Sequence, residues 1–306
     1  MLMIGQHLLS IAQLTPEDID HIFTVARDMR DRLQSSRKKR DDLDGRAVIN
    51  LFYENSTRTR TSFELAAKYL GAEVVNIVAS ASSVQKGESL KDTAATLNRL
   101  KPDGIIMRHP ASGAHKILCE NVDAIVINGG DGTHAHPTQA LLDGLTISDH
   151  KGDFSKLTIA IIGDILHSRV ARSNIALYRK YGATIRVAGP RTLIPPAISD
   201  EGVIVCPDME TACRDADVIM MLRIQLERQD AGLFPSVEEY AHFYELNPRR
   251  LALAKPDVIV LHPGPINRGV EIEPSVADGD RSLINEQVTN GLAIRMALLK
   301  IMTEEA

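Results

Sequence analysis

The sequence predicts an α/β protein made of two doubly wound parallel-sheet domains of similar size. Its 306 residues are enough for two domains of about 100 to 200 residues each. Short apolar runs alternate with longer amphipathic stretches, as expected where helices connect parallel strands. A cluster of Asp, His, Lys and Gly at residues 150–155 interrupts this alternation near the middle of the chain. We therefore expect one domain over residues 1–148 and a second over residues 149–306.

The composition excludes several classes of protein. Hydrophobic residues make up 44% and charged residues 25% of the chain, which is typical of folded globular proteins and not of disordered or fibrous ones. The net charge of -5 provides no basic surface for nucleic acid, and no apolar run is long enough to span a membrane. Three cysteines without C-x-x-C spacing fit a reducing compartment (Cys119, Cys206 and Cys213). We expect a cytoplasmic protein that binds neither nucleic acid nor membrane.

The first half should begin with a helix and continue with four strands. Thr15 precedes a proline and two acids, which is the pattern of a helix N-cap, and the helix should run to about Leu33. The charged stretch 37–44 contains both basic and acidic residues, so we interpret it as a solvated, self-compensating linker. Strands are expected at 47–52, 73–78, 104–107 and 124–127, each followed by a helix-like stretch.

The second half should contain five strands. They are expected at 158–162, 184–187, 203–205, 218–222 and 258–261. Parallel sheets bind ligands at the carboxyl ends of their strands. Polar clusters that follow a strand are therefore the candidates for a functional site.

The first such cluster is STRTRTSFE at residues 56–64, between a strand and a helix. A strand-to-helix turn rich in hydroxyl and guanidinium groups offers backbone N–H groups, side-chain donors and the positive end of a helix dipole. The cluster therefore predicts a phosphate site, with an ordinary N-cap beside surface arginines as the alternative. Arg58 and Arg60 should point in different directions, so that one binds the ligand and the other supports the structure.

Further polar groups follow strands of the first half. Arg108 comes directly after a strand, and His136 opens the helix after the next strand, so both could polarise a reacting carbonyl group. The loop 82–90 carries Lys86, which could serve as a point charge for an anion, although such a loop taken alone is more often exposed and inert. The remaining histidines of this region are interpreted as local polar residues: His109, His115 and His134.

Two arginines stand out in the second half. Arg169 lies near the start of a helix, and Arg223 directly follows a strand. Arginines from two strand ends suit the two carboxylates of a dicarboxylate. The stretch HPGP at residues 262–265 follows the last strand, where two prolines fix a rigid turn and leave carbonyl groups available as acceptors.

No cofactor and no metal ion are expected. Gly163 follows a strand but stands alone, so the G-x-G-x-x-G pattern of a dinucleotide site is absent and a dehydrogenase is disfavoured. His134 and His136 form a His-x-His pair, but no third ligand lies at a suitable spacing in the sequence.

Together these motifs resemble the carbamoyltransferase superfamily and, within it, the catalytic chains of the aspartate carbamoyltransferase branch. The resemblance is carried by FYENSTRTRTSFE (52–64), KGE (86–88), RHP (108–110), HPTQALLD (136–143), RIQ (223–225) and HPGP (262–265). Ornithine enzymes typically have a cysteine in an HCLP stretch where this chain has Pro263 and Gly264. Asn55 and Ala135 depart from the family, which usually has proline and often has glutamine at these positions.

The resemblance implies a site for carbamoyl phosphate and a site for L-aspartate. The carbamoyl phosphate set would be Ser56, Thr57, Arg58, Thr59, Ser82, Arg108, His136, Gln139, Gly264 and Pro265. The aspartate set would be Lys86, Arg169, Arg223 and Gln225. Five of these residues would carry the catalysis: Arg58, Thr59, Lys86, Arg108 and His136.

The implied reaction transfers the carbamoyl group to the amine of L-aspartate and gives N-carbamoyl-L-aspartate and phosphate, an early step of pyrimidine biosynthesis. The first domain would bind carbamoyl phosphate and the second would bind aspartate. The active site would lie in the cleft between them, and a C-terminal helix at 283–303 would pack back on the first domain.

The resemblance also implies a homotrimer with shared active sites, in which Ser82 and Lys86 act across an interface. Dihydroorotase and regulatory chains remain open as partners. Two alternatives to the implied activity are a carbamoyltransferase for another amine acceptor and a non-catalytic chain that scaffolds a neighbouring enzyme.

Overall fold

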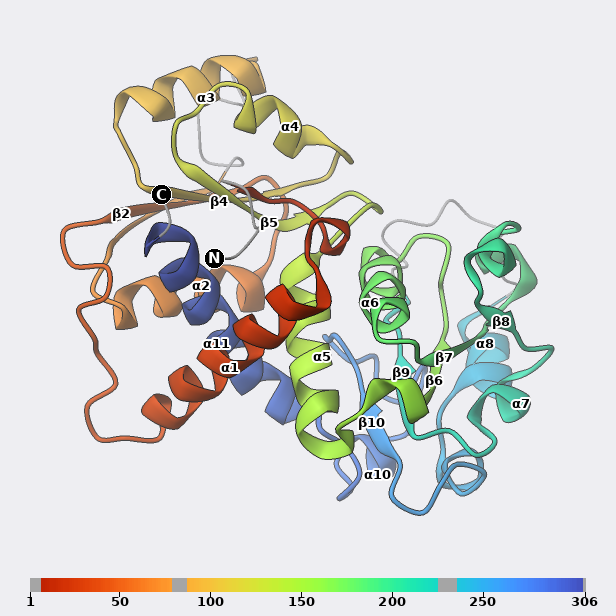
Figure 1. Ribbon diagram of the computed structural model, residues 1–306. Coiled ribbons are helices and arrows are strands. Elements are labelled where there is room, and N and C mark those ends of the chain that lie inside the picture. Colours follow the sequence, from red (N-terminus) through yellow and green to blue (C-terminus); the bar gives the residue numbers. More distant parts are fainter. Residues whose placement is uncertain (1–6, 79–86, 225–235, 305–306) are drawn as a thin grey trace. The chain divides into compact units, whose positions relative to one another are not determined.

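The computed structural model describes residues 7–78, 87–224 and 236–304 (Figure 1). The chain divides into two compact units: unit 1 comprises Met1–Leu142 with Thr289–Ala306, and unit 2 comprises Asp143–Val288. Both crossings between the units lie inside helices, α5 (Pro137–Lys151) and α11 (Ile284–Glu304). Within the described residues each unit contains one five-stranded sheet. The predicted α/β class with two parallel sheets is confirmed.

The sheet of unit 1 has the strand order β1-β5-β4-β2-β3, and its described strand pairs are all parallel. Its strands are β1 (His7–Leu8), β2 (Ala47–Phe52), β3 (Glu73–Val78), β4 (Gly104–His109) and β5 (Ile125–Asp131). The predicted bounds of β2 and β3 are confirmed, whereas β4 and β5 extend further toward their carboxyl ends. The sequence pattern misses β1 because two residues show no periodicity.

Helices cover both faces of this sheet. They are α1 (Pro16–Leu33), α2 (Thr57–Tyr69), α3 (Leu90–Arg99), α4 (Ala114–Cys119) and the 3-10 turn η1 (Ile11–Gln13), with the ends of α5 and α11 that belong to unit 1. In Figure 1, α3 and α4 lie on one face, and α1, α2 and α11 lie on the other. Because both faces are covered, the central strands are nearly continuous apolar runs.

Two local predictions for unit 1 have different outcomes. The N-cap of α1 is confirmed, since Thr15 Oγ1 accepts from the Asp18 N–H at 3.2 Å and the Asp18 carboxylate accepts from the Thr15 N–H at 2.9 Å. The stretch 37–44 is self-compensating, but it is not simply a solvated linker. The Asp42 carboxylate lies 2.6 Å from Arg40 Nε, within the stretch, and 2.7 Å from Lys300 Nζ of α11. The ion pair with Lys300 connects the stretch to the C-terminal helix.

The sheet of unit 2 has the order β10-β9-β6-β7-β8, again with parallel pairs. Its strands are β6 (Thr158–Ile162), β7 (Thr184–Ala188), β8 (Ile204–Val205), β9 (Val218–Met221) and β10 (Ile259–Leu261). Its helical segments are α6 (Arg169–Lys180), α7 (Met209–Cys213), α8 (Val237–Tyr244), α9 (Pro248–Leu251), α10 (Pro274–Ala277), η4 (Phe154–Lys156), η5 (Arg191–Leu193) and η6 (Ile198–Glu201). Among the helices described in either unit, none has the length and apolar character needed to cross a membrane.

Thr15→Ala should lower the free energy of unfolding by about 1 kcal/mol, because it removes half of the reciprocal cap of α1. The matched control is Thr24→Ala in the same helix, where the hydroxyl donates to the Asp20 carbonyl at 2.9 Å and caps no helix end. Denaturant titration of both variants and the parent measures the two costs. A cost for Thr24→Ala that equals or exceeds that of Thr15→Ala would contradict the proposed stabilisation by the cap.

Candidate active site

In unit 1, the structure brings Arg108 and Thr59 together. Arg108 lies at the carboxyl end of β4, and its Nη1 donates to Thr59 Oγ1 at 3.2 Å and to the Gly129 carbonyl at 3.4 Å. Its Nε donates to Glu54 Oε2 at 3.0 Å. The two side chains of the ion pair are only 14% and 15% exposed, so the guanidinium group is held in one orientation. Glu54 lies just before the hydroxyl-rich turn, and the sequence pattern gives no sign of its bond to Arg108.

The N-terminus of α2 has features that suit an anion. Its N-cap residue, Ser56, makes no side-chain cap hydrogen bond, and its first turn contains no acid. By contrast, α1 has a capping box and two acids in its first turn. The first backbone N–H groups of a helix have no partners within the helix and carry the positive end of its dipole. Arg58 is exposed and Arg60 is half-buried.

His136 and Gln139 stand at the start of α5. The Gln139 N–H donates to the His136 carbonyl at 3.0 Å, which places the two residues one turn apart at the N-terminus of the helix. Both side chains are buried within the chain. Seven of the predicted carbamoyl phosphate residues thus follow the carboxyl ends of β2, β4 and β5 or lie at them: Ser56, Thr57, Arg58, Thr59, Arg108, His136 and Gln139.

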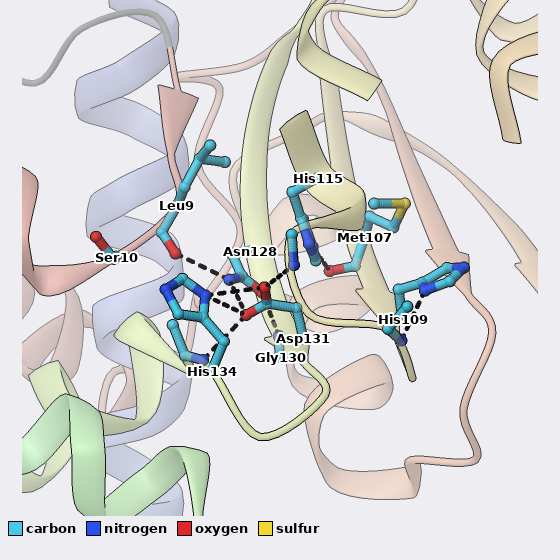
Figure 2. A network of polar contacts seen from close by, with 12 residues as sticks. Leu9, Ser10, Met107, His109, His115, Asn128, Gly130, Asp131 and His134 are labelled. Atoms are coloured by element: carbon cyan, nitrogen blue, oxygen red, sulfur yellow. Dashed lines mark hydrogen bonds and ion pairs between the residues drawn. The ribbon is translucent and has the colours of Figure 1, made fainter. Parts of the chain in front are cut away.

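Asp131, the last residue of β5, is at the centre of a hydrogen-bond network (Figure 2). Its carboxylate accepts from the backbone N–H groups of Gly113 at 2.8 Å and Ala135 at 3.0 Å, from Asn128 Nδ2 at 2.9 Å and from His134 Nδ1 at 2.9 Å. Burial acts to raise the pKa of Asp131, but the hydrogen bonds from Gly113, Asn128 and His134 outweigh it and hold the pKa below its ordinary value. The carboxylate is therefore ionised at neutral pH.

The other histidines near this network have local roles, as predicted. His115 is buried, and its Nε2 lies 2.7 Å from the Met107 carbonyl, so this nitrogen carries the proton. His109 Nδ1 accepts from the Ala111 N–H at 3.0 Å. Burial lowers the pKa of both rings. His134 is tied to Asp131 as described above.

In unit 2, the two predicted arginines follow adjacent strands. Arg169 is the first residue of α6, after β6, and it is buried. Arg223 follows β9 by two residues and is half-buried. Strands β6 and β9 are hydrogen-bonded neighbours, so both arginines lie on the side of the sheet where the carboxyl ends of these two strands are found. Ser168 Oγ accepts from the Ala171 N–H at 3.1 Å and caps α6.

The HPGP turn follows β10 and is held by one hydrogen bond to α11 and one within the turn. The His262 N–H donates to Gln287 Oε1 at 3.0 Å, and His262 Nδ1 accepts from the Gly264 N–H at 2.8 Å. Gly264 has a φ of 60° and is joined to Pro265 by a cis peptide bond. Such a positive φ favours glycine.

Glu271 is a second anchor that the sequence analysis missed. It is fully buried and accepts from the Ile224 N–H at 2.9 Å and the Asn267 N–H at 2.8 Å. Ile224 directly follows Arg223, and Asn267 lies two residues after the HPGP turn. One carboxylate therefore joins the segment that carries Arg223 to the segment that carries Gly264 and Pro265. Three predicted site residues lie outside the described residues: Ser82, Lys86 and Gln225.

Comparisons with known proteins show which family this chain resembles. The family model described as "Aspartate/ornithine carbamoyltransferase, carbamoyl-P binding domain" matches residues 6–149, and the "Asp/Orn binding domain" model matches residues 155–302. The aspartate carbamoyltransferase catalytic subunit of Ruminiclostridium cellulolyticum is 56% identical over 98% of this chain and 96% of that protein. The subunit of Pelotomaculum thermopropionicum is 54% identical over 98% and 97%.

Two solved structures, one of an aspartate enzyme and one of an ornithine enzyme, are similar in fold to this chain. Aspartate transcarbamoylase from Trypanosoma cruzi, in complex with carbamoyl phosphate and aspartate, has a TM-score of 0.88 and 32% identity over 97% of each chain. Ornithine carbamoyltransferase from Pyrococcus furiosus has a TM-score of 0.86 and 29% identity over 98% of this chain and 97% of its own. Since both domain models match and more than half of the residues are shared with the two bacterial relatives named above, the chain belongs to the aspartate/ornithine carbamoyltransferase family.

Proposed function

We propose that this chain is an aspartate carbamoyltransferase, which transfers the carbamoyl group of carbamoyl phosphate to the amine of L-aspartate in pyrimidine biosynthesis. The observation that carries the proposal is the pairing of two kinds of anion site in one chain. Unit 1 holds Arg108 in a fixed orientation beside Thr59 and the uncapped N-terminus of α2. Unit 2 presents Arg169 and Arg223 after adjacent strands. A phosphate group and a dicarboxylate are the ligands that these two arrangements fit.

Carbamoyl phosphate would be bound by the start of α2 and by Arg108. Ser56, Thr57, Arg58 and Thr59 would bind its phosphate through hydroxyl, guanidinium and backbone N–H groups. Arg108 would bridge the phosphate and the carbonyl oxygen. Gln139 and the carbonyl groups of Gly264 and Pro265 would accept hydrogen bonds from the carbamoyl amide, which fixes its orientation.

The amine of aspartate attacks the carbamoyl carbon, and negative charge then collects on the carbonyl oxygen. Thr59, Arg108 and His136 would stabilise that oxygen, and a single donor of this kind is worth about 3 to 4 kcal/mol. The bond to phosphate breaks as the tetrahedral intermediate collapses. The departing phosphate can accept the proton that the amine loses, so orientation and charge provide the catalysis without a dedicated protein base.

The acceptor site would select aspartate by charge. Arg169, Arg223, Gln225 and Lys86 would bind its two carboxylates. Ornithine carries an ammonium group where aspartate carries its second carboxylate, and two arginines would repel that group. The HPGP turn in place of a cysteine-containing HCLP stretch also supports aspartate as the acceptor.

We further propose a cytoplasmic homotrimer in which Ser82 and Lys86 complete the site of a neighbouring chain. Strand β3 is at the edge of its sheet, and Val75 on this strand is 53% exposed. An apolar side chain on an open strand edge is the kind of surface that a second chain covers. The free thiols of Cys119, Cys206 and Cys213 support a reducing compartment.

The purified chain should form N-carbamoyl-L-aspartate from carbamoyl phosphate and L-aspartate, and it should form no citrulline from L-ornithine, because the paired arginines favour a dicarboxylate. Parallel reactions with the two acceptors, followed by chromatography of the products, measure this. Product from ornithine alone would overturn the acceptor assignment and retain the carbamoyl phosphate half. No product from either acceptor would favour the scaffold alternative.

Arg58→Ala should lower turnover about 100-fold or more, because it removes a charged donor to the phosphate, while the fold is unchanged since this side chain is exposed. The matched control is Arg99→Ala, which removes another exposed arginine at the end of α3 and should leave turnover within about twofold. Steady-state kinetics and circular dichroism compare the three proteins. Turnover of Arg58→Ala at the wild-type level would reject the proposed phosphate site.

Mixing Lys86→Ala chains with Arg58→Ala chains should restore activity that neither variant has alone. In a trimer with shared sites, an intact site needs its Arg58 from a Lys86→Ala chain and its Lys86 from a neighbouring Arg58→Ala chain. When equal amounts of the two variants mix at random, about a quarter of the sites meet both requirements. The measurement is turnover before and after subunit exchange, with exchange itself verified by mass spectrometry. Complete exchange without recovery would rule out sharing through these residues.

A further inference from the structure

The carboxylate of Asp131 bonds to two loops that lead to different catalytic side chains. Its Oδ2 accepts from the Gly113 N–H at 2.8 Å. Gly113 ends the loop 110–113, which begins two residues after Arg108. Its Oδ1 accepts from the Ala135 N–H at 3.0 Å, and Ala135 directly precedes His136. One side chain therefore joins the segment after β4 to the segment before α5.

The same two loops are also packed against each other. The Gly132 N–H donates to the His109 carbonyl at 2.9 Å. A Cβ atom on Gly132 would lie 2.4 Å from Ser112 Oγ and 2.9 Å from the Pro110 carbonyl oxygen, which is too close for any real contact. The two loops are therefore in contact at Gly132, with no room for a larger residue there. This contact and the Gly132–His109 hydrogen bond fix the distance between the loops.

Asp131 is itself held in place by groups on its own strand and next to it. Asn128 Nδ2 donates to Asp131 Oδ1 at 2.9 Å and to the Leu9 carbonyl at 2.8 Å, and Asn128 Oδ1 accepts from the Gly130 N–H at 2.7 Å (Figure 2). Asp131 is 1% exposed. A buried carboxylate with charge-assisted bonds to several donors has one orientation, because turning it would break more than one of them.

We propose that Asp131 is a positioning residue for the carbamoyl transfer, and that its carboxylate sets the placement of Arg108 relative to His136. This inference rests on the proposed function, in which both residues bind the carbonyl oxygen. Donors to a developing oxyanion must be held to within about 0.5 Å, and Arg108 lies at the end of β4 whereas His136 follows β5. The link through Gly113 and Ala135 supplies that constraint without any contact between Asp131 and the substrate.

Asp131→Asn tests the link with no change in side-chain size. The amide can keep its oxygen toward Ala135 and Asn128, but its NH₂ group then faces the Gly113 N–H, and two donors cannot bond. We expect kcat per folded chain to fall about 30- to 100-fold, with the KM for aspartate changed less than about threefold, since the acceptor residues are not touched. Circular dichroism gives the folded fraction.

The matched control is Asp103→Asn, the same change at the opposite end of the same sheet. The Asp103 carboxylate, just before β4, accepts from the Ala47 N–H at 2.8 Å and from Arg46 Nη1 at 2.7 Å. This variant should lose some stability and keep kcat within about twofold. A fall in kcat as large as that of Asp131→Asn would overturn the proposal, because the effect would then be a general one.

Gly132→Ala tests the same placement by a different route, since its methyl group would push the two loops apart while Asp131 is unchanged. Gly132 has a φ of 48°, whereas Gly45 has a φ of 76° and no atom within 4 Å of the place that a methyl group would take, so Gly45→Ala is the control for backbone strain alone. We expect kcat of Gly132→Ala to fall by about as much as that of Asp131→Asn, and kcat of Gly45→Ala to be unchanged.

If Asp131→Asn and Gly132→Ala both retain kcat within about threefold of their controls, or if both fail to fold, Asp131 is not a positioning residue. Failure of the proposed function is distinct, because the wild-type chain would then be inactive.

Discussion

Parallel strands must all end at the same edge of their sheet, and the candidate site depends on this constraint. In unit 1 the adjacent strands β5, β4 and β2 end at Asp131, His109 and Phe52. Residues far apart in the chain therefore follow one sheet edge. In unit 2 the same constraint groups the segments after β6, β9 and β10, which carry Arg169, Arg223 and the HPGP turn. The chemistry of each unit is thus located by topology before any side chain is considered.

The features that can be predicted from this sequence are those that are local. Strands β2, β3 and β6 were predictable because each is a short, mainly apolar run, and the phosphate turn was predictable because hydroxyl and guanidinium groups are dense within nine residues. Glu54, Asp131 and Glu271 were not predictable as anchors. Their partners are Arg108, the Gly113 N–H and the Ile224 N–H, which lie 54, 18 and 47 positions away. A carboxylate in a sequence carries no sign of such a partner.

Each unit contains a buried carboxylate that joins two segments of the chain by accepting hydrogen bonds from both. Asp131 joins the segments after β4 and β5, and Glu271 joins the segments after β9 and β10. A buried charge is costly unless several donors replace the water that it loses, and each of these carboxylates has backbone N–H groups from two segments. Both therefore act as acceptors that hold loops together, while the charged groups assigned to substrate in the same units are mainly arginines.

The bond from Ala135 to Asp131 has a consequence for how this position can evolve. The group that donates is the main-chain amide, which every amino acid except proline possesses. The side chain at position 135 can therefore change without loss of this link, which depends on the path of the backbone. This bond therefore tolerates any side chain at position 135 except proline, which has no backbone N–H.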